Sequence, residues 1–442
     1  MSGQIHEFPP LTNFEDQDGP PSVLIQPSRQ LVVPEGVHAL GTRDIKPRLK
    51  KWQREHPLEL VCMAHIGEPE GDPMKAVVTA LKTAPDQPDS LDYGDPQGIK
   101  PLREAIAEHL NRRSIYPWDV DPDSIVVTPG SKMAGMISAR AVLNPGDIAA
   151  MSELAYPGHY AGVLMNGGHL IPFHVKKHDS YHHDPDQMKE VLDRYQPRLI
   201  WVCNPGNPSG LVYTEDEAAP IIEHMVSHPD CVLIQDIIYK DLTFDNSHSQ
   251  MVVFSRNPQI ASRVITNDGA SKGPRATGLR IGFVVVPEGQ DLLLQNIADQ
   301  ANADFAGVSP LTSKGIIPAF TPEGDNDTAR FRDSLQNKRD TVISMINAIP
   351  GLNAPIPQGA FYALINVADT GMDAGQFYNF ALDHGVSVVP ISYFGATIPN
   401  INGNPFLREE IANSTVRWSF GGSLEPQIQG LRRLYTALSE ES

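Results

Sequence analysis

The sequence predicts an α/β fold in which a mainly parallel sheet lies between helices. Three observations indicate this class. The chain has 442 residues, 40% of them hydrophobic, which is enough for a large buried core. From about residue 61, short apolar runs alternate with helical segments, as in proteins with parallel sheets. Polar and glycine-rich loops follow several of these runs, and open α/β sheets bind ligands at such strand ends.

Each expected element comes from such a run. Apolar runs predict strands at 124–128, 148–152, 169–174, 198–203, 231–236, 263–267 and 281–286. Helical periodicity predicts helices at 132–143, 185–196 and 215–226. A different mixture follows, with a long helix from about Asp327, strands at 361–366, 386–389 and 415–419, and helices at 374–385 and from Leu424. We therefore predict three regions: an N-terminal arm with part of a small domain over 1–60, a large domain over 61–320, and a small α+β domain over 321–442.

Charge and composition exclude several classes of protein. The formal net charge is −18, whereas nucleic-acid binders concentrate Lys and Arg on one face. The first residues are acidic and lack the basic start and apolar core of a signal peptide. No apolar run approaches the length of a membrane span. Cys62, Cys203 and Cys231 lack the spacing of a disulfide framework or a zinc site, so we expect reduced thiols in a cytoplasmic protein.

Two predicted strands end in loops with polar side chains. Residues 204–210, Asn-Pro-Gly-Asn-Pro-Ser-Gly, follow the strand 198–203. An Asn in this irregular loop can donate its amide hydrogen bonds into a site, although the segment alone is typical of a turn. Asp236 closes the strand 231–236 and is followed by Tyr239. A buried carboxylate at that point needs a cation or a donor, and capping a helix would satisfy it equally well.

Three further signals concern amine chemistry and anion binding. Lys272 lies in a glycine-rich loop between two apolar runs, where desolvation would lower its pKa and make its amine a nucleophile toward carbonyls. Arg280 is flanked by glycines and can fork onto a phosphate. Residues 128–132 join a strand to a helix whose free N-terminal amides suit an anion. Arg417, in the strand 415–419, can hold a carboxylate.

The order and spacing of these motifs resemble the class I/II aminotransferases, the fold-type I family of pyridoxal-5'-phosphate (PLP) enzymes. The resemblance begins at Ile66-Gly-Glu-Pro69, continues through Tyr93, Gly98 and residues 102–104, and ends at Arg417. It therefore covers everything except the N-terminal arm. It implies PLP as the cofactor, amino acids and keto acids as substrates, and a homodimer with shared active sites.

The resemblance also implies roles for individual residues around the cofactor ring. Lys272 would hold the cofactor as a Schiff base and later move the substrate Cα proton. Asp236 would pair with the ring nitrogen and keep the ring an electron sink. Asn207 and Tyr239 would hydrogen-bond the ring hydroxyl oxygen. Tyr156, in the segment Ala-Tyr-Pro-Gly, would stack on the ring.

The remaining roles concern the phosphate and the substrate. Tyr93 would reach the phosphate of the neighbouring subunit. The substrate α-carboxylate would bind Arg417 next to Gly67, with Asn207 close by. The residues that would hold the phosphate within one subunit share positions at a helix N-terminus or in the lysine loop: Gly130, Ser131, Lys132, Ser271 and Arg280.

The sequence departs from the family pattern at several positions. The usual phosphate-binding Ser three residues before the Schiff-base lysine is Gly269. Arg275 lies in the stretch 273–277, where members commonly carry an aromatic and small residues, and it would serve phosphate, substrate or only the surface. His159 either touches substrate or, as we favour, is structural. Glu68 either recognises a cationic substrate end or faces solvent. The histidines at 169, 174, 178, 182 and 183 lack compact ligand spacing, so we expect a solvated loop and no metal.

Three functions fit the motifs to different degrees. An aminotransferase would transfer the α-amino group of an amino acid to a keto acid. The runner-up is a non-transaminating enzyme of the same fold: an amino-acid oxidase, a cyclase, or a β- or γ-elimination or replacement enzyme, for example on S-adenosylmethionine. A cofactor-sensing regulator would need a basic winged-helix domain ahead of the fold, and the arm is too short and too acidic for one.

Overall fold

The computed structural model describes residues 42–245, 251–395 and 398–440. By its internal contacts the chain divides into Met1–Val32 and Val33–Ser442, and the described residues all belong to the second unit. The predicted arm before residue 42 lies outside the described residues. Within the described part of the chain, no helix combines the length and the apolar character needed to cross a membrane.

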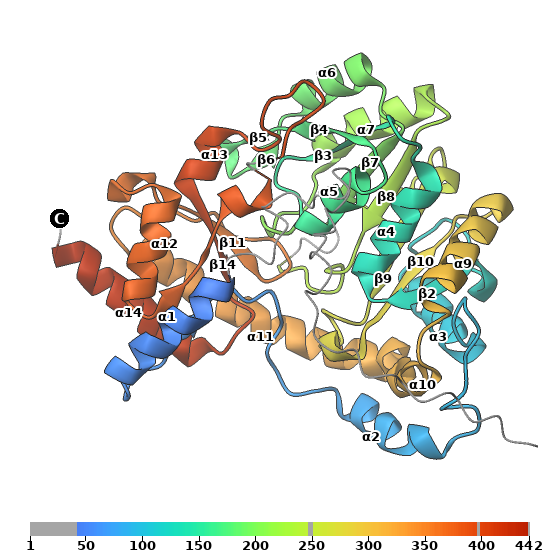
Figure 1. Cartoon of the computed structure of the whole chain (residues 1–442), viewed down its shortest axis with the longest axis horizontal. Helices are drawn as coiled ribbons and strands as arrows, with labels where there is room; N and C mark the ends of the chain where they lie inside the picture. Colours follow the sequence, from blue (N-terminus) through green and yellow to red (C-terminus); the bar gives the residue numbers. More distant parts are fainter. Residues whose placement is uncertain (1–41, 246–250, 396–397, 441–442) are drawn as a thin grey trace, which may run out of the picture. The chain divides into compact units, whose positions relative to one another are not determined.

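A seven-stranded sheet is the centre of the fold (Figure 1), and it confirms the predicted α/β class. Strand β10 is antiparallel to both of its neighbours, β2 and β9, and the other pairs are parallel. The strand order is β2 (Ile125–Pro129), β10 (Ile281–Val285), β9 (Val264–Gly269), β8 (Val232–Asp236), β7 (Leu199–Cys203), β3 (Ile148–Ser152) and β4 (His169–Phe173). Each predicted strand of the sheet is present.

Helices cover both faces of this sheet. Ile125 and Val127 pack in the same apolar cluster as α3, whereas Val126 between them packs with α4. Burial on both faces explains why the strands are continuous apolar runs. The helices of this part are α2 (Lys75–Thr83), α3 (Lys100–Asn111), α4 (Ser131–Val142), α5 (Pro157–Leu164), α6 (Pro185–Tyr195), α7 (Glu215–Ser227), α9 (Asp291–Phe305) and α10 (Pro310–Ile316).

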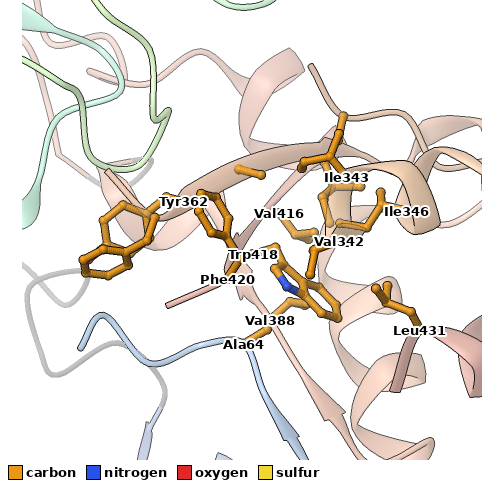
Figure 2. Packing of buried hydrophobic residues seen from close by; sticks show 14 of the residues in the cluster. Ala64, Val342, Ile343, Ile346, Tyr362, Val388, Val416, Trp418, Phe420 and Leu431 are labelled. Atoms are coloured by element: carbon orange, nitrogen blue, oxygen red, sulfur yellow. The ribbon is translucent and has the colours of Figure 1, made fainter. Parts of the chain in front are cut away.

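A second, antiparallel sheet has the order β11 (Tyr362–Asn366), β14 (Thr415–Ser419) and β13 (Val389–Pro390). Figure 2 shows the core beneath it, where the buried Trp418 lies among Val342, Val388, Val416 and Leu431. Helix α1 packs against α12 on this side (Figure 1). The elements here are α1 (Thr42–Glu55), β1 (Cys62–Met63), α11 (Pro322–Asn347), α12 (Ala374–Asp383), β12 (Val386–Ser387), α13 (Glu409–Ser414) and α14 (Leu424–Glu440).

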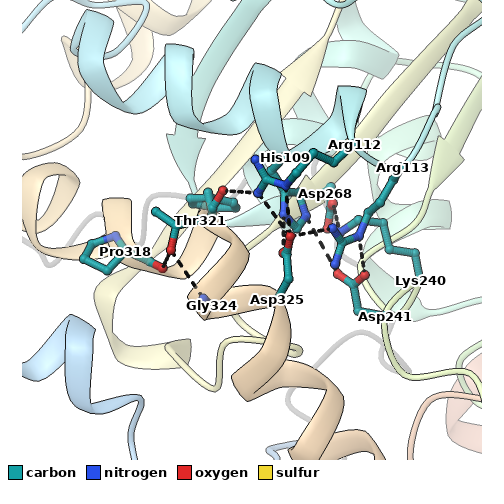
Figure 3. A network of polar contacts seen from close by, with 11 residues as sticks. His109, Arg112, Arg113, Lys240, Asp241, Asp268, Pro318, Thr321, Gly324 and Asp325 are labelled. Carbon is teal, nitrogen blue, oxygen red and sulfur yellow. Dashed lines mark hydrogen bonds and ion pairs between the residues drawn. The ribbon is translucent and has the colours of Figure 1, made fainter.

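Helix α11 begins at Pro322, five residues before the predicted start. Thr321 caps it by accepting a hydrogen bond from the Gly324 amide, and Pro322 occupies the first helical position, where its missing N–H costs nothing. The first turn of α11 also joins a buried network of charges (Figure 3). Asp325 accepts from the ring of His109, at 2.9 Å, and pairs with Arg113 at 3.1 Å.

Candidate active site

The polar loops predicted from the sequence converge on one cavity of about 600 Å³. It opens where β7, β8 and β9 end, and the second sheet closes it from the other side. Its walls contain most of the predicted site residues together with several that the motifs did not indicate. The lining residues are Lys46, His65, Ile66, Gly67, Glu68, Ser131, Lys132, Tyr156, His159, Cys203, Asn207, Asp236, Ile238, Tyr239, Ser271, Lys272, Thr277, Arg280, Tyr362, Val389 and Arg417.

Lys272 reaches into this cavity from the loop that follows β9. Its Nζ donates a hydrogen bond to the carbonyl of Gly67 at 2.7 Å and lies 5.5 Å from the ring centre of Phe361. Burial, followed by the nearby positive charge of Arg417, lowers the pKa of the Lys272 amine to about 8. A neutral, nucleophilic amine is therefore far more accessible here than on the protein surface.

Asp236 is held at the end of β8 by two donors. Its Oδ1 accepts from the amide of Ile238 at 3.1 Å, and its Oδ2 accepts from Nε2 of His159 at 3.0 Å. The imidazole of His159 stacks on Trp201 with 4.8 Å between ring centres, so its orientation is fixed by packing. The structure thus gives His159 a structural contact with Asp236, the role favoured from the sequence, although the same ring also borders the cavity.

Arg417 is buried, with only 2% of its surface exposed. Its Nη1 donates to Asn207 Oδ1 at 3.1 Å and its Nη2 donates to the carbonyl of His65 at 2.9 Å. Its guanidinium lies 4.5 Å from the ring centre of Tyr362. Within the described part of the chain no carboxylate pairs with this guanidinium, and Nε has no hydrogen-bond partner. A buried cation in this state calls for an external anion.

Hydroxyl groups line the wall beside Arg417. Asn207 Nδ2 lies 3.4 Å from the hydroxyl of Tyr239, which in turn lies 3.1 Å from the hydroxyl of Tyr362. Burial raises the pKa of Tyr239 well above its ordinary value and that of Tyr362 to about 12. Both hydroxyls therefore remain protonated and can donate hydrogen bonds into the cavity.

The side of the cavity predicted to bind an anion forms where the backbone around Gly282 lies close to the N-terminus of α4. Gly130 has φ +87°, and a Cβ on it would lie 2.5 Å from Nη2 of Arg280. A Cβ on Gly282 would lie 2.2 Å from the amide nitrogen of Ser131. The positive φ of Gly130 and the close backbone contact at Gly282 both favour glycine where Arg280 and the N-terminus of α4 come together. Ser131, Lys132, Ser271 and Arg280 all border this side.

Gly269 has a packing reason for departing from the family pattern. A Cβ added there would lie 2.7 Å from the carbonyl oxygen of Ile281 and 2.9 Å from Cα of Gly282. The close pairing of β9 with β10 therefore leaves no room for a serine. Ser271 and Thr277 are the hydroxyl side chains from the lysine loop that border the cavity.

Three predicted or open positions have distinct environments. Tyr93 is 96% exposed in the single chain and does not line the cavity. The Arg275 side chain is 6% exposed, paired with Asp327 of α11 and outside the cavity lining, so the surface alternative is wrong. Glu68 is exposed, borders the cavity and accepts a hydrogen bond from the hydroxyl of Thr277.

The expected solvated histidine loop is only partly correct. His169 and His178 are exposed. His182 and His183, in β6 (His182–His183) paired with β5 (Val175–Lys176), instead contact the buried Glu217. Burial alone would raise the pKa of Glu217, but hydrogen bonds from these two histidines lower it. The pair thus anchors the start of α7, where Glu217 completes the capping box with Thr214.

The motifs missed two polar residues that the fold brings to the cavity. Tyr362 arrives from the start of β11, and His65 from the segment after β1. Neither has a local signal beyond an apolar run. One group of described residues has the compact spacing of metal ligands: His159, Cys203 and Asp236, whose ligand atoms lie within 4.8 Å of one another. The carboxylate of this group already accepts from the imidazole. All three cysteines are free thiols.

Fold and cavity together define an α/β enzyme centred on a buried lysine. The family model described as aminotransferase class I and II matches residues 65–417, and the chain belongs to this family. The aspartate/prephenate aminotransferase of Thermus thermophilus is 28% identical over 349 residues, which are 78% of this chain and 86% of that protein. The arginine–pyruvate transaminase of Pseudomonas aeruginosa is 28% identical over 346 residues, 76% and 83% of the two chains.

Solved structures agree with the fold. The aspartate aminotransferase of Rhizobium meliloti superposes with a TM-score of 0.80 at 23% identity, covering 94% of this chain and 99% of the other. The chain is accordingly a class I/II aminotransferase with the fold of that family.

Proposed function

We propose that this aminotransferase holds pyridoxal 5'-phosphate on Lys272 and uses it to transfer the α-amino group of an amino acid to a keto acid. Membership of the family supports the cofactor, because the family normally uses it. The residues that line the cavity fit such a group. A desolvated lysine amine, a carboxylate held by His159, and an anion side made of glycine-spaced backbone amides are the three features that its aldehyde, ring nitrogen and phosphate require.

The proposal assigns each contact to residues on the cavity wall. Asp236 would pair with the ring nitrogen, while the hydroxyl of Tyr239 and the amide of Asn207 would donate to the ring oxygen. Tyr156 would cover one face of the ring. The phosphate would lie at the N-terminus of α4 with Gly130, Ser131, Lys132, Ser271 and Arg280.

When bound, the cofactor supplies a reactive carbon and a ring that accepts electrons. The chain supplies orientation and proton transfer. Arg417 would hold the substrate α-carboxylate beside Gly67 and Asn207, and this contact turns Cα toward the lysine. Nζ of Lys272 would take the proton from Cα and return it on the cofactor side. Its lowered pKa keeps a fraction of the amine free to do so near neutral pH.

The observation that carries the substrate part of the proposal is the unpaired Arg417. A buried guanidinium without a carboxylate in the described chain is unfavourable unless a ligand supplies the negative charge. The α-carboxylate common to amino acids and keto acids has the fork geometry that a guanidinium binds best. A binding site used alternately by both kinds of substrate needs this shared anchor.

The proposal includes a homodimer, a cytoplasmic location and separate large and small domains, 61–320 and 321–442. The nearly complete exposure of Tyr93 supports the dimer, because a tyrosine on the surface of one chain is free to reach the partner's phosphate site. Free thiols support a reducing compartment. The second sheet, which begins only at Tyr362, supports the domain division.

The test is a half-reaction without a second substrate. The holoenzyme is mixed with each of the common amino acids, and the cofactor is released and assayed for its amine form. We expect at least one amino acid to convert the bound aldehyde into the amine, and a keto acid to reverse it. The Lys272→Ala variant should fold, but borohydride reduction should no longer attach the cofactor covalently to the protein. Conversion by none of the amino acids, together with oxygen consumption or release of a leaving group, would contradict transamination.

The dimer has its own test. Chains inactivated by Lys272→Ala and chains inactivated by Tyr93→Ala are mixed under conditions of verified subunit exchange. If Tyr93 completes the partner's site, a mixed dimer has one intact site and recovers part of the activity. No recovery after exchange would argue against shared sites.

A further inference from the structure

Arg275 lies where three segments meet, and none of its contacts is to the cavity. Its guanidinium pairs with Asp327 of α11 and lies 4.6 Å from the ring centre of Phe331, one turn further along that helix. Its Nε donates to the carbonyl oxygen of Asp72 at 3.0 Å. The side chain is 6% exposed, and it is not among the described residues that line the cavity. Binding cofactor phosphate directly is therefore not its role.

The segment that Arg275 holds, residues 65–72, provides acceptors for two of the proposed active-site side chains. The carbonyl of Gly67 accepts from Nζ of Lys272 at 2.7 Å. The carbonyl of His65 accepts from Nη2 of Arg417 at 2.9 Å. A shift of segment 65–72 therefore changes the partners of both the lysine and the arginine at once.

Segment 65–72 is fastened on its other side to the chain after β14. The amide of Glu70 donates to the carbonyl of Gly421 at 2.8 Å, and the Glu70 carboxylate accepts from the amide and hydroxyl of Ser423, both at 2.6 Å. Toward the lysine loop, besides the bond from Lys272 to the Gly67 carbonyl, it is joined by Glu68 with Thr277 and by the bond from Arg275 to Asp72. Arg275 bonds both to this segment and to Asp327, and it thereby connects segment 65–72 and the lysine loop with α11.

The local sequence makes room for this connection. A Cβ added to Gly71 would lie 3.2 Å from Cδ of Arg275 and 3.5 Å from Cε2 of Phe331. The distance to Arg275 is shorter than an ordinary van der Waals contact, whereas the distance to Phe331 is ordinary. Arg275 itself has φ +58°, a left-handed conformation that is unusual for a non-glycine residue. The glycine and the left-handed turn together aim the arginine under segment 65–72 and away from the cavity.

We propose that Arg275 is a positioning residue that holds segment 65–72 in place, so that Arg417 keeps the geometry needed to bind the amino-acid substrate. The substrate part of this inference rests on the function proposed above. The effect of losing Arg275 should fall on substrate binding more than on phosphate binding, because segment 65–72 supplies a carbonyl acceptor to the carboxylate-binding Arg417 and contacts none of the proposed phosphate ligands.

The experiment compares Arg275→Ala with Arg330→Ala. Arg330 pairs with the same Asp327 at 3.2 Å, but its side chain is 71% exposed and it does not contact segment 65–72. We expect Arg275→Ala to raise the KM for the amino acid roughly 10- to 100-fold, the loss expected for charge-assisted hydrogen bonds, with cofactor affinity and kcat changed much less. Arg330→Ala should leave all three values near those of the wild type.

Hydrogen exchange of a peptide covering 65–72 provides a readout independent of turnover. It should become faster in Arg275→Ala and remain unchanged in Arg330→Ala. Arg275→Lys keeps the charge but not the fork, and we expect it to restore thermal stability better than KM. If no amino acid is a substrate, the exchange result still tests whether Arg275 holds the segment, so failure of the proposed function is distinguishable from failure of this inference.

Gly71→Ala tests the same contact from the opposite side. Alone it should raise the KM by a smaller factor, and in an Arg275→Ala background it should add nothing, because the side chain that it displaces is gone. The inference is overturned if Arg275→Ala leaves the KM and the exchange of 65–72 unchanged, if cofactor affinity falls as much as substrate affinity, or if the two arginine variants behave alike.

Discussion

Lys240→Met should destabilise the fold because it removes the cation that two buried carboxylates share. Nζ of Lys240 lies 2.6 Å from Asp268 and 2.9 Å from Asp241, and its side chain is only 6% exposed (Figure 3). Asp241 would keep Arg113 as a partner at 2.7 Å. Among the described residues, the carboxylate of Asp268, near the end of β9 and 1% exposed, would keep only its hydrogen bond from the amide of Gly269.

Breaking a buried ion pair by removing one partner costs about 3–5 kcal/mol, because the remaining charge stays buried. The matched control is Lys176→Met, which breaks a pair with Asp184 at 3.2 Å in which both side chains are about one-third exposed. Exposed pairs contribute about 0–1 kcal/mol. Denaturant unfolding of both variants near neutral pH, with the wild type beside them, should therefore show a deficit several times larger for Lys240→Met.

The loss of unfolding free energy in Lys240→Met should also depend on pH, in a direction that the pKa of Asp268 determines. Burial raises the pKa of Asp268 to about 6 even with Lys240 present, and removing Lys240 raises it further. A carboxyl whose pKa is raised on folding stabilises the fold below its ordinary pKa, and this contribution is lost as the pH rises through the folded value. The Lys240→Met deficit should shrink on acidification from about pH 7 toward pH 4.

Asp268→Asn in the Lys240→Met background should recover much of the lost stability, because it removes the unpaired charge. Equal deficits for the Lys240→Met and Lys176→Met variants, or a deficit that grows on acidification, would refute the reasoning.

Three further outcomes follow from the site. Gly269→Ser should lower the thermal midpoint and cofactor affinity together, because its side chain would be forced against the Ile281 carbonyl; tighter cofactor binding would contradict this. Arg417→Lys should raise the KM for amino acid and keto acid alike, by about tenfold or more, because the charge remains but the fork is lost; an effect on one substrate alone would count against a shared anchor. His159→Phe should lower kcat about tenfold with little change in KM, since Asp236 loses a donor; an unchanged kcat would show that the contact is dispensable.

The strands and the residues at their ends could be predicted because each depends on a short, continuous stretch of sequence. A strand buried on both faces must be an apolar run, and a polar residue that closes such a run must lie near the sheet edge. Asp236, Lys272 and the loop 204–210 were placed in this way, and all three border the same cavity. The predicted start of α11 at Asp327 is too late, because the helix begins with Thr321 as its cap and Pro322 as its first residue, which together are a start signal in the sequence.

The second layer of the site could not be predicted because it depends on contacts between distant segments. Asp327, the partner of Arg275, is 52 residues away in the sequence, and His65 meets Arg417 across 352 residues. Neither partner has a motif of its own. The sequence alone therefore leaves three alternatives for Arg275, and it indicates Tyr362 only as part of an apolar strand.

The side chains that line the cavity are mostly basic, whereas the whole chain has a net negative charge. The protein has 53 acidic and 35 basic residues, yet the cavity is lined by two carboxylates and five basic side chains. One of the carboxylates, Asp236, is already bonded to an imidazole, and the other, Glu68, to a hydroxyl. A positive cleft in a negative protein concentrates field lines and attracts small anions while the remaining surface repels them. A cofactor with a phosphate group and two kinds of carboxylate substrate are negatively charged, as a positive cleft requires. The basic residues are Lys46, Lys132, Lys272, Arg280 and Arg417.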